Sequence, residues 1–155
     1  MTHEEYMKQA LTQAELAAEQ DEIPVGCLIV DPQTNEIIAS THNQSQHGGD
    51  VTDHAEILCI QQACQKLQQN RLWNLDMYVT LEPCTMCAAA ISFARINHLY
   101  FGAFDEKGGA VANGVRFYEQ PTCHHRPQVT GGISEQECAE ILKDFFRHKR
   151  KTKEE

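Results

Sequence analysis

Hydrophobic positions in the first forty residues change from helical to extended spacing. Apolar residues recur every three or four positions behind Thr2 and Glu5, which predicts an amphipathic helix that begins with a capping box. A continuous apolar run at 25–30 and a polar turn at 31–35 follow. The pattern predicts a β-hairpin whose second strand covers 36–39.

Helices and strands alternate in the middle of the chain. Apolar residues at helical spacing over 57–67 predict a helix that Asp53 caps. A strand over 75–81, a helix over 84–94 and a strand over 96–101 follow it. Because such alternation places helices on a sheet with some parallel pairing, the sequence predicts an α/β fold of three layers.

The pattern is less regular in the last third of the chain. Residues 105–132 contain five glycines and two prolines without a clean period, so no element is predicted there. Ser134 and Glu137 form a second capping-box pattern ahead of an apolar stripe, which predicts a C-terminal helix. Since no repeat or linker interrupts the chain, residues 1–155 are expected to form a single domain.

Composition narrows the class of protein. No stretch approaches the roughly 20 apolar residues of a membrane span, and no basic patch precedes an apolar segment at the N-terminus. We therefore expect a soluble, cytoplasmic protein. The seven cysteines are an odd number, and two of them form Cys84-x-x-Cys87. This favours reduced thiols or metal ligands over a disulfide framework.

Charge is distributed unevenly along the chain. The net charge of −9 argues against a general polyanion-binding protein. Residues 143–155, however, hold six Lys or Arg against three Asp or Glu, so this segment carries +3 and the rest of the chain −12. Two interpretations stay open: a local patch that contacts phosphates, or a solvated helix end.

Two short segments have the residue types and spacing of a metal site. His54 and Glu56 are followed downstream by Pro83, Cys84 and Cys87. A structural zinc ion usually has four protein ligands, whereas a catalytic one keeps a position open for water. Because His54, Cys84 and Cys87 supply three ligands, the sequence predicts a catalytic zinc site.

The predicted helix starts explain how these side chains reach one point. Side chains lean toward the N-terminus of a helix, so residues of a first turn can point past its end. Helix N-termini also favour thiolates. Glu56 has two interpretations, a carboxylate that completes helix capping or a proton carrier beside the metal. The three zinc ligands nearby favour the second.

Two other groups of residues are assigned structural roles. The run Cys123-His124-His125 has no second ligand pair at suitable spacing, so no second metal is predicted. Trp73 stands among apolar residues and is predicted to lie in the core rather than to stack on a base.

Longer segments around these motifs resemble bacterial tRNA-specific adenosine deaminases, which belong to the cytidine and deoxycytidylate deaminase superfamily. The zinc nucleobase deaminase signature, H-x-E followed by P-C-x-x-C, is present at 54–56 and 83–87. The resemblance covers nearly the whole chain. It includes Pro24-Val25-Gly26, Asn43, 78–84, Phe101-Gly102-Ala103 with Asp105 and Lys107, and 144–147.

The resemblance implies a homodimer with a three-layer α/β/α cytidine-deaminase-like fold, in which helices cover both faces of a mixed five-stranded sheet. It implies conversion of adenosine to inosine at the wobble position of tRNA, with arginine tRNA as substrate. By the same resemblance, His54, Cys84 and Cys87 hold one Zn²⁺ per subunit. Glu56 then carries protons.

The resemblance also implies which residues contact the anticodon stem-loop of the tRNA. The chain departs from the family pattern at Phe104 and at 111–114, both in the segment expected to face RNA. The implied contacts are Asn43 for the flipped nucleoside, Val25, Leu81 and Asp105 for the pocket or the flanking nucleotides, and Phe145, Phe146 and Arg147 beside the RNA.

Two alternative functions remain open. A deaminase of a free base or nucleoside, such as guanine or cytosine, would use the same zinc ligands and Glu56 but would not need the basic C-terminal segment. A zinc-stabilised RNA-binding or scaffold protein without catalysis would need neither Glu56 nor an open coordination position.

Overall fold

The computed structural model describes the backbone of residues 1–154 and the side chains of residues 1–151. Within this part of the chain, none of the helices combines the length and the apolar character that crossing a membrane requires. The helices are α1 (His3–Glu19), α2 (Ala55–Leu67), α3 (Thr85–Ala94), the short 3-10 helix η1 (Phe117–Glu119) and α4 (Glu135–Glu154). The strands are β1 (Gly26–Asp31), β2 (Glu36–His42), β3 (Asp76–Leu81), β4 (His98–Ala103) and β5 (Gln128–Gly131).

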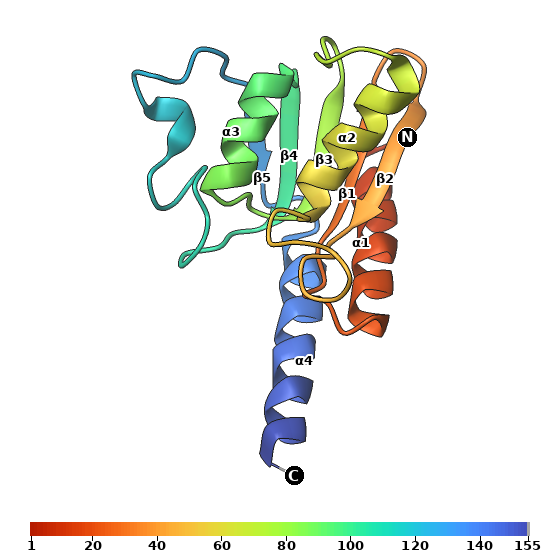
Figure 1. The fold of residues 1–155 in the computed structure, drawn as a ribbon, viewed down its shortest axis with the longest axis vertical. Helices are drawn as coiled ribbons and strands as arrows, with labels where there is room; N and C mark the ends of the chain where they lie inside the picture. The colour runs from red at the N-terminus through yellow and green to blue at the C-terminus, as the bar shows by residue number, and fades with distance from the viewer. Residues whose placement is uncertain (155) are drawn as a thin grey trace.

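The strands of the described chain form one mixed five-stranded sheet in the order β2-β1-β3-β4-β5. β1 is antiparallel to β2 and β3, whereas β3, β4 and β5 are parallel to one another. α2 and α3 cover one face of the sheet, and α1 and α4 cover the other (Figure 1). The predicted three-layer α/β fold is therefore confirmed.

Both faces of the central strands are buried. In β1, Cys27 and Ile29 belong to the core under α2 and α3, whereas Leu28 and Val30 belong to the core under α1 and α4. Because side chains alternate between the two faces of a strand, a strand covered on both sides needs an apolar residue at nearly every position. This explains the continuous apolar run in the sequence.

The N-terminal helix and hairpin are confirmed. The N–H of Glu5 donates to Thr2 Oγ1 over 3.1 Å, and the N–H of Thr2 donates to Glu5 Oε2 over 2.9 Å. These two bonds are the predicted capping box of α1. β1 and β2 form the predicted antiparallel hairpin, although β2 continues past the predicted strand to His42.

Two predicted helix caps are wrong. His54, not Asp53, is the N-cap of α2, and Asp53 Oδ2 instead accepts a hydrogen bond from the N–H of Asp50 over 3.0 Å. Ser134 has a φ of +50°, outside the extended conformation that a capping box uses. Sequence spacing alone marked both positions, whereas the tertiary path of the preceding loop decides the backbone conformation at a helix start.

The segment 105–132 contains a strand that the hydrophobic pattern did not locate. β5 pairs in parallel with β4, and Val129 lies opposite Leu99. β5 has only four residues and lies at the edge of the sheet, where Val129 is exposed. A short edge strand without a buried face leaves no alternation to detect.

Helix α4 packs on the sheet with its first turns and extends beyond the sheet with its last ones (Figure 1). Cys138 is buried and Phe145 is half-buried on the side facing the body, whereas Phe146 is exposed. Lys149 forms an ion pair with Asp21, which follows α1. This pair attaches the basic part of α4 to the loop between α1 and β1.

β1 crosses α1 closely at Gly26. A Cβ there would lie 1.9 Å from the carbonyl oxygen of Ala10 and 2.7 Å from the backbone nitrogen of Ala14. We expect Gly26→Ala to lower the free energy of unfolding by about 3 kcal/mol, measured by urea denaturation, because α1 would have to move. Gly48→Ala is the control: its Cβ meets no heavy atom within 4 Å, and its φ of +86° costs about 1 kcal/mol. Equal losses in the two variants would contradict this account.

Candidate functional site

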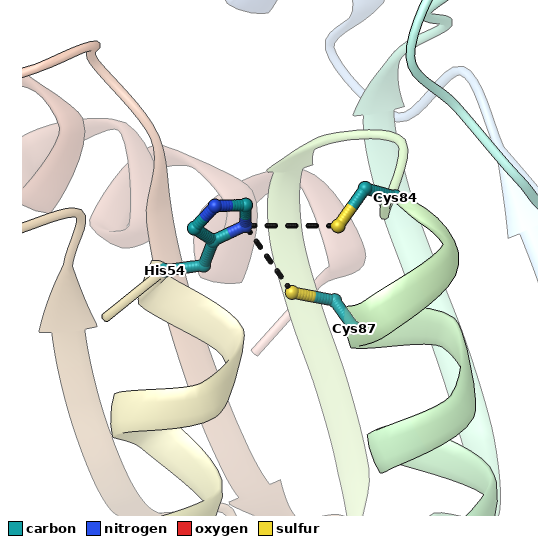
Figure 2. Close-up of side chains that lie close together, drawn as sticks. All are labelled: His54, Cys84 and Cys87. Atoms are coloured by element: carbon teal, nitrogen blue, oxygen red, sulfur yellow. Dashed lines mark hydrogen bonds between the residues drawn. The ribbon is translucent and has the colours of Figure 1, made fainter. Parts of the chain in front are cut away.

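Two helix N-termini meet at one point. His54 is the N-cap of α2, Cys84 is the N-cap of α3, and Cys87 lies in the first turn of α3. His54 Nδ1 lies 3.7 Å from Cys84 Sγ and 3.5 Å from Cys87 Sγ (Figure 2). Because neither N-cap side chain makes a capping hydrogen bond, both can face the common point. The structure thus brings the three predicted ligands together.

The spacing and chemistry of the three donor atoms fit Zn²⁺. Zinc–nitrogen and zinc–sulfur bonds of about 2.0 and 2.3 Å at a tetrahedral angle separate the two donors by about 3.5 Å. Both observed distances are close to this value. In the described part of the chain, His54, Cys84 and Cys87 are the one group of three or more candidate ligands whose donor atoms lie within 4.8 Å of one another. Glu56 does not belong to this group.

The pKa values of the two cysteine thiols are shifted in opposite directions. Hydrogen bonding with the Cys87 thiol, followed by hydrogen bonding with His54, lowers the pKa of Cys84 to about 4 in spite of burial. The hydrogen bond with Cys84 and burial raise the pKa of Cys87 far above its usual range. Without a metal ion, Cys84 is therefore the more acidic of the two thiols. Because metal-binding cysteines must be deprotonated, an ion bound here would favour loss of the proton on Cys87.

Glu56 lies in the first turn of α2 and is only 4% exposed. Burial raises the pKa of its carboxyl group to about 7, and the nearby Cys84 acts in the same direction. A carboxyl group that gains and loses a proton near neutral pH is suited to acid–base chemistry. The site therefore combines three soft metal ligands with a separate acid.

A cleft of about 180 Å³ opens onto these residues. His54, Glu56 and Cys84 form part of its wall. Four residues predicted to contact the nucleoside, its pocket or the flanking nucleotides also line it: Val25, Asn43, Leu81 and Asp105. Five further lining residues were not anticipated from the sequence: Ile23, Ser45, Ala55, Glu82 and Gly108.

Asn43 is buried, and backbone groups hold its side chain. Its Nδ2 donates to the carbonyl oxygen of Ile23 over 3.3 Å, and its Oδ1 accepts from the N–H of Ser45 over 3.3 Å. Its own backbone N–H donates to the carbonyl oxygen of Val25 over 3.0 Å. The side-chain bonds use one amide N–H and one oxygen lone pair, so the amide is oriented in the cleft wall.

Known proteins resemble the chain over nearly its full length. A family model described as MafB19-like deaminase matches residues 1–150. A tRNA-specific adenosine deaminase of Agrobacterium fabrum is 57% identical over 145 residues, which cover 94% of this chain and 94% of that protein. The chain belongs to the bacterial tRNA-specific adenosine deaminase family.

Solved structures agree with this family assignment. One, from a study of A-to-I editing by tRNA:A34 deaminases at the wobble position of transfer RNA, is 56% identical with a TM-score of 0.86. The match covers 89% of this chain and 99% of that chain. The guanine deaminase of Nitrosomonas europaea matches with a TM-score of 0.76 at 20% identity, over 93% of this chain and 84% of that chain. At that identity the likeness shows the shared deaminase fold alone.

In this member of the tRNA-specific adenosine deaminase family, the residues of α4 that were predicted to contact RNA lie outside the cleft. Phe146 lines a separate depression together with Ile23 and Gln46. Because Ile23 lines both hollows, the depression borders the cleft. Arg147 is exposed and pairs with Asp144 over 3.3 Å.

Glu82 is a candidate functional residue that the sequence pattern did not single out. Its buried carboxylate accepts hydrogen bonds from the loop that begins at Asp105. Burial acts to raise the pKa of Glu82, but hydrogen bonds from Asp105, Asn113 and Val111 outweigh it and lower the pKa. The available signal in the sequence was a charged residue between an apolar strand and the ligand Cys84.

Trp73 does not lie where the sequence predicts. Trp73 is 53% exposed and meets the His125 ring edge-on, so its predicted core position is wrong. The loop before β3 places the indole ring outside the sheet.

Cys123 and Phe104 make contacts within the fold. Cys123 Sγ donates to the carbonyl oxygen of His125 over 3.2 Å, which is a structural contact. Phe104 packs edge-on against Phe101, with ring centroids 5.0 Å apart.

We expect Cys87→Ala to lower the zinc content from about one ion per chain to near zero, because the two remaining donors hold the ion poorly. Elemental analysis of the purified protein measures this content. Cys64→Ala is the control, since Cys64 is a free, half-buried cysteine outside the ligand group. Full zinc content in Cys87→Ala would contradict the assignment.

Proposed function

We propose that the chain is a zinc-dependent enzyme that deaminates adenosine to inosine at the wobble position of tRNA, with arginine tRNA as its substrate. One observation carries this proposal. Three metal-ligand side chains and a buried carboxyl group meet in a chain that is 57% identical to a tRNA-specific adenosine deaminase. Residues 1–155 are proposed to form a single deaminase domain that acts in the cytoplasm, where tRNA is modified.

The proposed reaction exchanges one bond at carbon 6 of adenine for another. A carbon–oxygen bond forms from water, the carbon–nitrogen bond breaks, and ammonia leaves. A bound zinc ion supplies Lewis acidity, which makes water nucleophilic at neutral pH. In this proposal His54, Cys84 and Cys87 hold the ion. Their donor types and their spacing support that role.

Glu56 is proposed to carry the proton that the reaction moves. Its carboxylate accepts a proton from the attacking water and delivers it to the departing amino nitrogen. Two features support this role: the carboxyl group lines the cleft beside the metal ligands, and it is buried. Burial keeps bulk water away from the transferred proton.

Four lining residues are proposed to contact the nucleoside or the nucleotides beside it. Val25 and Leu81 offer apolar contacts to the base, and the oriented amide of Asn43 offers hydrogen bonds. Asp105 lies at the same cleft, where flanking nucleotides can reach it. An anticodon loop is single-stranded, so the target base leaves its stack at low cost.

Helix α4 is proposed to lie beside the RNA. Exposed Phe146 can stack on a base, and Arg147 begins a run of cations toward the C-terminus. These cations stand out because the chain as a whole carries −9. Local positive charge is what attracts phosphates, because salt screens the more distant acidic body.

We also propose that the chain forms a homodimer. Phe93 at the end of α3 is 70% exposed, and Trp73 is exposed in the loop before β3. Large aromatic side chains in contact with water are typical of interfaces between subunits. A second copy of the chain is proposed to cover them.

The deaminase proposal predicts inosine from an arginine tRNA anticodon stem-loop that carries adenosine at the wobble position, detected by mass spectrometry. Glu56→Ala should keep its zinc but lower kcat about 10³-fold, because general acid–base catalysis contributes roughly 10² to 10⁴. Glu140→Ala, which removes an exposed carboxylate of α4, is the control. The proposal fails if zinc-loaded wild-type protein makes no inosine, or if it turns over free guanine or cytosine instead.

Charge removal on α4 tests the RNA surface. We expect the triple variant Arg147→Gln, Arg150→Gln and Lys151→Gln to raise KM for the stem-loop and to reduce the salt dependence of binding. The slope should fall by about 0.7 for each lost phosphate contact.

The matched control for this variant removes three exposed cations elsewhere, as Lys8→Gln, Lys66→Gln and Arg71→Gln. The net charge of the two variants is the same. Identical salt slopes in both variants would show that α4 does not lie beside the RNA.

A further inference from the structure

Glu82 is a buried acid whose carboxylate accepts its hydrogen bonds from one loop, residues 105–113. It follows β3 directly and is 2% exposed. Its Oε1 accepts from the N–H of Asp105 over 3.0 Å and from Asn113 Nδ2 over 2.8 Å. Its Oε2 accepts from the backbone N–H groups of Val111, Ala112 and Asn113 over 3.1, 2.9 and 3.0 Å. One carboxylate thus accepts five hydrogen bonds.

These bonds attach both ends of the 105–113 loop to Glu82, which lies two residues before Cys84. The N–H of Ala110 donates to the carbonyl oxygen of Pro83 over 2.9 Å, which adds a sixth attachment. Gly109 passes so close that a Cβ there would lie 2.5 Å from Glu82 Cδ. The loop therefore rests on the Glu82 carboxylate without an intervening side chain.

The fastened loop forms one wall of the cleft. Asp105, Gly108 and Glu82 all line it. Asp105 Oδ1 also accepts from the N–H groups of Lys107 and Gly108 over 3.2 and 2.9 Å, so the turn at the start of the loop has a fixed shape. The position of Asp105 in the wall depends on its own N–H bond to Glu82.

We propose that Glu82 is a positioning residue for the substrate: it holds the wall that carries Asp105 in the conformation that receives the flanking nucleotides. This inference rests on the proposed tRNA function. Glu82 touches neither the nucleoside nor the metal in this account. It acts through the loop, so its loss affects substrate binding more than the chemical step.

Glu22 provides a matched comparison beneath another loop of the cleft, the one after β2 that contributes Asn43 and Ser45. It is also buried, and its carboxylate accepts from the N–H groups of Gln46 and His47 over 2.9 and 2.7 Å. It therefore holds the loop after β2 by the same kind of bond. Among the described residues, the hydrogen bonds to the Glu22 carboxylate come from this loop and none comes from the 105–113 loop, so Glu22→Gln makes the same chemical change beneath a different loop.

The test is a double-mutant cycle between Glu82→Gln and Asp105→Ala, read as kcat and KM on the arginine stem-loop at confirmed zinc content. In Glu82→Gln one oxygen becomes an NH₂ group, which leaves at least two of the five donors without an acceptor. We expect KM to rise roughly tenfold, kcat to change less than about threefold, and zinc content to stay unchanged.

Coupling between the two sites decides the proposal. The double variant Glu82→Gln with Asp105→Ala should lose clearly less kcat/KM than the product of the two single losses, because both act through one loop. Glu22→Gln with Asp105→Ala should lose the full product. Independent losses for Glu82 and Asp105, or a fall in kcat alone, would overturn the proposal.

Hydrogen exchange supplies a readout that needs no substrate. In Glu82→Gln the amide of Asp105 should exchange faster if Oε1 is the oxygen replaced, and those of Val111, Ala112 and Asn113 if it is Oε2. Unchanged protection at all four amides overturns the proposal. If that variant does not fold, Asn113→Ala removes a single donor and should give a smaller effect of the same kind. Absence of inosine from wild-type protein would refute the proposed function, whereas unchanged exchange would refute the role of Glu82 in holding the loop.

Discussion

The site depends on two helix starts whose N-cap side chains face each other instead of their own backbones. A side-chain N-cap stabilises a helix by about 1 kcal/mol, and neither α2 nor α3 has one. Packing compensates for this loss, because Cys59 and Ala63 of α2 and Ala88 and Ile91 of α3 are fully buried against the sheet. The sheet therefore fixes the two helices firmly enough to keep their first turns available for a metal ion.

Sequence patterns were a good guide wherever one local rule decides the outcome. Thr2 with Glu5 needs only a spacing of three, and the apolar run at 25–30 needs only a strand covered on both faces. That His54, Cys84 and Cys87 lie together was also predicted, because few residue types bind zinc. In each case the type and spacing of the residues themselves are enough to predict the structure they form.

The errors share one cause, which is that a loop path set by distant contacts decided the result. Asp53 had the right type and position for a cap, but its loop uses the carboxylate to hold Asp50. β5 forms because β4 offers it an edge, not because its four residues favour a strand. Glu82 was not distinguishable among the 22 Asp and Glu residues, since its role depends on amides that lie up to 31 positions away.

The difference in acidity between the two cysteines has a consequence for the site when no metal is bound. Cys84 is partly accessible and its thiol has the lowered pKa, whereas Cys87 is enclosed and its pKa is raised. Sulfur anions are the form that alkylating agents and peroxides attack, so Cys84 without a bound ion would be open to irreversible damage. Coordination of an ion would thus also act as chemical protection, and chelators used during handling would shorten the working life of the preparation.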